Sequence, residues 1–261
     1  MTFHGAVVDL DGTVYRGDDL IPGADRGVAA LREAGIDVLF FSNNPTRSPA
    51  EFAAKLRALG VDADPGDVLT SGVVTAEFLA AEHAGDRLFV VGEDGLRSTL
   101  REAGLTTTDT REDADVLVAS FDRGFDYDRL TDALRVLQRD DVVFVGTDPD
   151  RTIPTGDGCM VPGSGAIIGA IAATTERDPD YVLGKPSQYA VDAARSHLGV
   201  PADECLVVGD RLDTDIEMGE RAGMTTVLVR TGVSDERTGR GSVEPDHVVD
   251  SLENVIEVLD A

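Results

Sequence analysis

The chain has 261 residues, 49 of them acidic and 23 lysine or arginine, and its formal net charge of −26 is spread along the whole length. No lysine- or arginine-rich segment, secretory signal or membrane-length apolar run occurs, so we expect a cytoplasmic protein with no nucleic-acid or membrane partner. Because salt near 1 M screens charge within about 3 Å, such an acidic surface favours the cytoplasm of an extreme halophile.

The predicted elements alternate between short β-rich runs and helices. The helices between the strands end at Gly35, Gly104 and Gly223, which are typical of left-handed helix caps. The strands are mostly continuous apolar runs, which favours parallel strands covered by helices on both faces. The expected strands are 5–9, 37–42, 87–92, 114–120, 141–146, 181–184, 204–209, 225–230 and 247–249. The sequence therefore predicts an α/β fold with an open, doubly wound parallel sheet of the Rossmann-like kind.

The first strand runs directly into the acidic stretch "DLDGT". Side chains two apart in an extended segment point the same way, so we expect Asp9 and Asp11 to aim at one point. Two carboxylates held that close repel each other unless a cation or a shared proton lies between them. An ordinary Asp-Gly turn explains this stretch equally well, and both interpretations stay open on these residues alone.

Three further polar clusters follow predicted strands, where ligands bind in doubly wound sheets. They are "SNN" (42–44), "GKPS" (184–187) and "GDRLDTD" (209–215). Together with Asp9 and Asp11, Asp210 gives a hard oxygen-ligand set suited to Mg²⁺. A lysine beside hydroxyl and amide donors gives a phosphate site, and a carboxylate there can attack phosphorus. Taken singly, "SNN" could instead cap the helix starting near Pro49, and the lysine could be a surface residue.

The strands between about 86 and 179 end in no comparable cluster, which indicates an inserted unit. We therefore predict a core formed by 1–85 and 180–261, with a second α/β domain at 86–179.

The four motifs, in this order, resemble those of the haloacid dehalogenase (HAD) superfamily. The motifs are "DLDGTVY", "SNN", "GKPS" and "GDRLDTDI", and the insert between the second and third is similar to the C2-type cap of class IIA, the NagD-like or p-nitrophenylphosphatase-like branch. The resemblance implies a Mg²⁺-dependent phosphatase of small phosphomonoesters such as sugar phosphates or nucleotides.

The resemblance also implies a role for each motif residue. Asp9 would be the nucleophile that becomes aspartyl-phosphate, and Asp11 the acid and base. Mg²⁺ would be held by the Asp9 carboxylate, the Asp11 backbone carbonyl and Asp210. The phosphoryl group would be bound by Ser42, Asn43, Asn44 and Lys185. Asp215 would hold Lys185 or a metal-bound water in position, and Thr13 would close a local backbone hydrogen bond.

Residues 146–166 resemble the family's specificity region in the cap, which usually reads Thr-Asn before the aspartate. This chain has Thr147 and Asp148 there instead. Asp148 either changes any substrate preference that depends on the amide or is one more surface acid, and both interpretations stay open. By family analogy, the strand edges of the cap are the expected surface for a homodimer.

Two alternatives to a phosphatase remain. One is a phosphotransferase or mutase of the same superfamily. The other is a regulatory module that accepts phosphate without turnover, as receiver domains do with clustered acids, Mg²⁺ and a lysine; the motif order and the large insert disfavour it.

Overall fold

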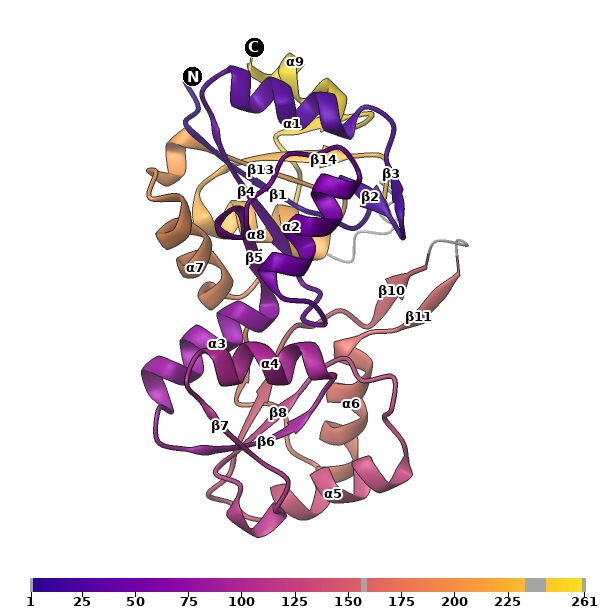
Figure 1. Ribbon diagram of the computed structural model, residues 1–261, viewed down its shortest axis with the longest axis vertical. Coiled ribbons are helices and arrows are strands. Elements are labelled where there is room, and N and C mark those ends of the chain that lie inside the picture. The colour runs from indigo at the N-terminus through magenta and orange to yellow at the C-terminus, as the bar shows by residue number, and fades with distance from the viewer. Residues whose placement is uncertain (1, 156–158, 233–242, 260–261) are drawn as a thin grey trace.

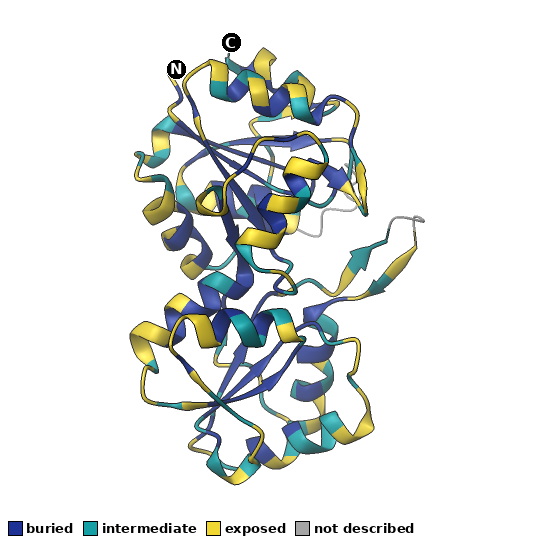
Figure 2. Cartoon of the chain, viewed as in Figure 1, coloured by how far each residue is buried: buried dark blue, intermediate teal, exposed yellow. Residues whose placement is uncertain are grey.

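The computed structural model describes residues 2–155, 159–232 and 243–259. The chain forms two lobes, each built on a parallel sheet with helices on both faces (Figure 1). We call the lobe that holds both termini the core lobe and the other the cap lobe. Buried residues fill the inner strands of both sheets (Figure 2). The predicted α/β fold is confirmed.

The core sheet has six strands in the order β15-β14-β13-β1-β4-β5, all parallel. Alternate residues of the central strand face opposite sides: Ala6 and Val8 pack under α1, α2 and α9, whereas Val7 packs under α7 and α8. The bounds are β1 (Gly5–Val8), β4 (Asp37–Ser42), β5 (Val68–Thr70), β13 (Cys205–Gly209), β14 (Thr225–Val229), β15 (His247–Val249), α1 (Ala24–Glu33), α2 (Pro49–Ala58), α7 (Gln188–Leu198), α8 (Glu217–Ala222) and α9 (Ile256–Leu259).

The cap sheet has five parallel strands in the order β12-β9-β8-β6-β7. One face is covered by α3 and α4 and the other by α5 and α6. The bounds are β6 (Arg87–Val91), β7 (Thr106–Thr108), β8 (Val116–Ala119), β9 (Val143–Gly146), β12 (Tyr181–Val182), α3 (Ser71–Glu82), α4 (Asp94–Glu102), α5 (Tyr127–Leu137) and α6 (Ser164–Thr175).

Helix α3 joins the two lobes. Its buried side chains, among them Val74, Phe78 and Leu79, belong to one apolar cluster that includes Phe41 of the core sheet and Val116 of the cap sheet. Because this cluster is continuous, the cap is packed onto the core and not merely tethered to it.

One predicted strand lies in the other sheet. We expected 181–184 in the core, but β12 pairs with β9 at the edge of the cap sheet, so the chain returns to the core sheet only after Val182. A buried apolar run shows that a strand is covered, but it does not show which sheet the strand joins. The chain also contains strands that the apolar pattern did not predict: β5, β7 and the hairpins β2 (Tyr15–Arg16)–β3 (Asp19–Leu20) and β10 (Thr152–Pro154)–β11 (Met160–Pro162).

The predicted helix ends are confirmed. Gly35, Gly104 and Gly223 have φ of 79°, 82° and 73°, in the left-handed region that ends a helix. Among the described residues, no helix combines the length and apolar character that crossing a bilayer needs.

Candidate active site

A cleft lies where the carboxyl ends of β1, β4 and β13 face loops of the cap lobe. The core contributes most of the predicted site residues, and the cap contributes the segment from Asp148 to the start of the β10–β11 hairpin. The lining residues are Asp9, Asp11, Ser42, Asn43, Asn44, Asp148, Asp150, Thr152, Ile153, Pro154, Lys185, Arg211 and Thr214.

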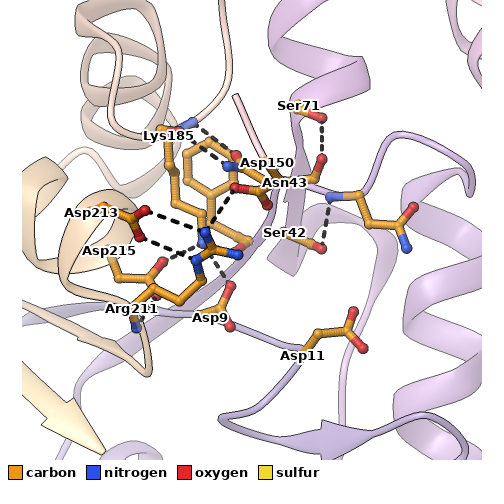
Figure 3. A network of polar contacts seen from close by, with 12 residues as sticks. Asp9, Asp11, Ser42, Asn43, Ser71, Asp150, Lys185, Arg211, Asp213 and Asp215 are labelled. Atoms are coloured by element: carbon orange, nitrogen blue, oxygen red, sulfur yellow. Dashed lines mark hydrogen bonds and ion pairs between the residues drawn. The ribbon is translucent and has the colours of Figure 1, made fainter. Parts of the chain in front are cut away.

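Lys185 is the centre of the buried polar network in this cleft (Figure 3). Its Nζ donates to Asp9 Oδ1 at 2.7 Å, to Asp215 Oδ1 at 2.6 Å and to the Phe41 carbonyl at 2.8 Å, which uses all three of its protons. Burial opposes the charged ammonium, but Asp215 and Asp9 outweigh it and raise the pKa of Lys185. The side chain, 2% exposed, is therefore a fixed positive charge beside Asp9.

Asp9 lies among other carboxylates. Burial raises its pKa well above the usual value, and the charges of Asp215 and Asp210 add to this effect while Lys185 opposes it. A second positive charge near these acids would therefore stabilise the ionised, nucleophilic form of Asp9.

The acids of this cluster fit a divalent metal ion. Asp9, Asp210 and Asp215 each offer a carboxylate oxygen, and these oxygens all lie within 4.8 Å of one another. Gly12, at φ 99°, packs so closely that a Cβ there would lie 2.5 Å from Asp210 Oδ2. The glycine thus leaves room for the buried Asp210 carboxylate beside Asp9. Oxygen-only donors of this kind suit Mg²⁺.

Asp11 does not point at the same spot as Asp9, which corrects the expectation from strand alternation. Strand β1 ends at Val8, and the following turn is closed by bonds from the Val14 and Tyr15 amides to the Leu10 carbonyl. Asp11 is turned away from Lys185 (Figure 3) and accepts a bond from Tyr15 Oη at 3.3 Å. It still lines the cleft, and burial raises its pKa while Lys55 opposes the rise.

Lys55 is a neighbour of the site that the sequence motifs did not reveal. Its Nζ lies 3.6 Å from the centre of the Tyr15 ring and donates to the Gly17 carbonyl at 2.7 Å, so Lys55 connects α2 to the β2–β3 hairpin. The composition did hold a signal: the chain has only two lysines, Lys55 and Lys185, against 21 arginines. Lys185 lines the cleft and Lys55 lies beside it.

Residues 42–44 all line the cleft, and one of them also binds the backbone of Lys185. Ser42 Oγ accepts from the Asn44 amide at 3.1 Å, and both residues line the cleft. The side chain of Asn43 instead pairs with the Lys185 backbone, accepting from its N at 2.8 Å and donating to its O at 3.1 Å. Asn43 therefore joins the loop after β4 to the loop that carries Lys185.

The alternative interpretation of "SNN" as a helix cap is wrong. Helix α2 is capped by Ser48, whose side chain accepts from the Glu51 amide in a reciprocal capping box. The Asn44 amide oxygen bonds to Thr46, within the turn before that cap.

Asp215 and Thr13 were expected to support the site, and only Asp215 belongs to the Lys185 network. Asp215 holds Lys185 through Oδ1 and accepts from the Arg211 amide through Oδ2 at 3.1 Å. Thr13 is buried, and its backbone N donates to the Leu10 carbonyl at 3.3 Å; its Oγ1 has no hydrogen-bond partner among the described residues. The local bond expected of Thr13 is thus made by its backbone.

The cap closes the cleft through an ion pair with the core. Asp150 Oδ1 lies 3.8 Å from Nη2 of Arg211, which also bonds to Asp213. Asp148 is buried, with 1% exposure, so its interpretation as a surface acid is wrong. Asp150 lies within the segment 146–166, which resembles the family's specificity region, and the fold brings it to Arg211.

Known proteins match this chain over nearly its whole length. Residues 6–106 match the family described as haloacid dehalogenase-like hydrolase, and residues 182–255 match a description as HAD-hydrolase-like. The sugar-phosphatase AraL of Bacillus subtilis is 36% identical over 98% of this chain and 93% of its own length. The chain belongs to the haloacid dehalogenase-like hydrolase family.

Solved structures of this family share the whole two-lobed architecture. The p-nitrophenyl phosphatase from Archaeoglobus fulgidus superposes with a TM-score of 0.92 at 37% identity, covering 99% of this chain and 100% of that one. NagD from E. coli K-12 gives a TM-score of 0.85 at 29% identity, over 97% and 98%. The resemblance to the NagD-like branch is confirmed. The expectation of a phosphomonoester hydrolase is confirmed at the level of the family.

Proposed function

We propose that this hydrolase removes phosphate from small phosphomonoesters by forming an aspartyl-phosphate on Asp9. The observation that carries the proposal is the pairing of a buried carboxylate with a fixed buried cation, Asp9 Oδ1 to Lys185 Nζ at 2.7 Å, inside a cleft shared by both lobes. A nucleophilic carboxylate needs this arrangement because a phosphate dianion otherwise repels it.

In the first half-reaction, Asp9 attacks phosphorus while Lys185 balances charge at the Asp9 side. Ser42 and Asn44 line the place where the phosphoryl oxygens would lie. Asp11 would give its proton to the leaving-group oxygen. Its raised pKa, caused by burial, favours the protonated form that this step needs.

In the second half-reaction, Asp11 takes a proton from the water that attacks the phosphorus of the intermediate, which returns Asp9 as a carboxylate. The turn after β1 suits this division of roles because it directs Asp11 away from Lys185. Among the described residues, Asp9 forms an ion pair with Lys185, whereas Asp11 forms none and has Lys55 only as a nearby charge. The two carboxylates therefore have different environments, as two carboxylates with different tasks require.

Mg²⁺ is the cofactor we propose, held by the Asp9 carboxylate, the Asp11 backbone carbonyl and Asp210. When bound, it would neutralise the phosphate and the Asp9–Asp210–Asp215 cluster. We expect a chelator to reduce the turnover of p-nitrophenyl phosphate to below about 1% and added Mg²⁺ to restore it, because a bound divalent ion contributes several kcal/mol to such transition states. Full activity after exhaustive chelation, confirmed by metal analysis of the protein, would contradict this role.

Named relatives support a small phosphorylated metabolite as substrate. They include a sugar-phosphatase, a 5'-nucleotidase and a dihydroxyacetone phosphatase. A phosphate-release screen over sugar phosphates, nucleotides and triose phosphates tests the class. Steady turnover supports the phosphatase. Transfer of phosphate to an acceptor supports a transferase or mutase. A single stoichiometric phosphorylation of the protein supports a regulatory module.

We also propose that the protein works in the cytoplasm of an extreme halophile. The net charge of −26 destabilises the compact state through self-repulsion, which salt screens. We expect the melting temperature to fall as KCl is lowered from about 3 M to 0.1 M, a change that lengthens the screening distance to about 10 Å. An unchanged melting temperature across this range, measured by circular dichroism, would contradict the proposal.

A homodimer through the cap stays a proposal. Strand β7 (Thr106–Thr108) is an edge strand of the cap sheet and offers unpaired backbone groups to a second copy. Light scattering in high salt tests it, with Thr107→Pro as the variant expected to give monomers.

A further inference from the structure

Asp148 is a buried acid that the proposed reaction does not use. It follows β9 in the loop that leads to the β10–β11 hairpin, and its side chain is 1% exposed. The loop passes very close to the core at this point, since a Cβ on Gly184 would lie 2.8 Å from Asp148 Cβ and 2.7 Å from Asn43 Oδ1. The loop that carries Asp148 is thus packed against the residue next to Lys185.

Hydroxyl groups and one amide surround the Asp148 carboxyl. Thr147 Oγ1 lies 2.9 Å from Asp148 Oδ2 and also 2.9 Å from Ser120 Oγ. The Asp150 amide donates to Oδ1 at 3.3 Å, and the Ser164 hydroxyl is a further partner. Because Ser164 Oγ already accepts from the Phe121 amide, its own proton is free to go to Asp148.

The charges near this carboxyl oppose its ionisation. Asp150 is an acid on the same loop, while Ser120 after β8 and Ser164 at the start of α6 approach as neutral hydroxyls. The cations Arg211 and Lys185, from the core, face Asp150. Burial and the charge of Asp150 raise the pKa of Asp148 to about 8.

A protonated carboxyl has the hydrogen-bonding pattern of an amide. One oxygen donates and the other accepts, as do the nitrogen and oxygen of asparagine, and the two groups have nearly the same shape. Here Oδ2 can donate to Thr147 Oγ1, which then donates to Ser120 Oγ, while Oδ1 accepts from the Asp150 amide.

We propose that Asp148 is a positioning residue that carries a proton and, acting as an amide would, fixes the segment 147–154 over the active site. This segment brings Asp150 to Arg211, and its last three residues, Thr152, Ile153 and Pro154 of β10, form one wall of the cleft. The effect on catalysis rests on the proposed phosphatase function; the presence of the proton does not.

The protonation of Asp148 determines how the stability of the fold changes with pH. An unfolded aspartate loses its proton near pH 3.9, whereas folded Asp148 keeps it to about pH 8, so the stability that it contributes is full below about pH 4 and is lost as the pH rises to about 8. An asparagine in its place has no such loss.

The test compares Asp148→Asn, Asp148→Ala and, as control, Asp140→Asn, which changes an exposed acid of the cap. We expect the melting temperature of Asp148→Asn to match that of the parent at pH 4 and to exceed it by about 5 °C or more at pH 8, with no such trend in the control. An equal difference in melting temperature at both pH values would contradict the proposed protonation of Asp148, whatever the result of the activity assay.

Turnover of p-nitrophenyl phosphate then tests the positioning. We expect Asp148→Ala to lower kcat/KM by about tenfold to a hundredfold, as misplacing a site by about 1 Å does, and Asp148→Asn to stay within about threefold of the parent. An alanine variant with parental kcat/KM, or an asparagine variant as impaired as alanine, would overturn the role of Asp148.

Discussion

Asp9→Asn is expected to lower turnover of every phosphomonoester to below about 1% of the parent, because loss of a covalent nucleophile typically costs several orders of magnitude. The amide has the shape of the carboxylate but cannot attack phosphorus. We expect the fold to persist, because the substitution removes one negative charge that Asp210 and Asp215 repel. Steady-state kinetics and the melting temperature together check both statements.

The control for this variant is Asp62→Asn, which removes the same charge at a position 95% exposed in its side chain. It should keep kcat within about twofold, as surface substitutions usually do little. A turnover above about 1% for Asp9→Asn, with deamidation back to aspartate excluded by mass spectrometry, would refute Asp9 as the nucleophile.

Lys185→Met is expected to lower kcat by at least two to three orders of magnitude, roughly the effect of removing one preorganised charge-stabilising donor. The buried acids Asp9 and Asp215 would lose their common cation. The pKa of Asp9 would then rise further, so any remaining activity should require a higher pH than in the parent. A pH profile of kcat measures this shift.

The same substitution should also destabilise the protein by about 3–5 kcal/mol, since removing one partner leaves buried charge unpaired. Arg101→Met is a suitable control, because it removes a cation from the exposed end of α4. A Lys185→Met protein with parental kcat, or with its activity shifted to lower pH, would contradict the role of Lys185.

The parallel sheets and most of the site could be predicted because each depends on local sequence. Continuous apolar runs specify covered strands, and polar residues directly after a strand lie at its carboxyl end. Asp9 and Asp210 directly follow β1 and β13 in this way, and Ser42 is the last residue of β4. They lie at one edge of the sheet because of the strand order, with β1 between the other two strands.

Other features depend on contacts that the sequence pattern does not contain. The direction of Asp11 is set by the turn after Val8, where the strand rule no longer applies. The placement of β12 depends on which sheet edge accepts the strand, and Lys185 lies in the segment that follows it. The pairing of Arg211 with Asp150 depends on how the lobes dock.

Asp148 shows how burial changes the meaning of a residue. In an acidic chain it resembled the many solvated carboxylates, and only its surroundings distinguish it from them. Thr147, Ser164 and the Asp150 amide offer the partners of an amide and no cation. A departure from the family's asparagine can therefore preserve the local hydrogen bonds.

Trapping of the covalent intermediate tests the account most directly. The enzyme is mixed with excess p-nitrophenyl phosphate and Mg²⁺ in high salt, quenched with acid within one turnover, digested and mapped by mass spectrometry. We predict one phosphoryl group on the peptide that contains Asp9, and none in Asp9→Asn. Turnover without any phosphorylated peptide, or phosphate on a different residue, would contradict the central claim.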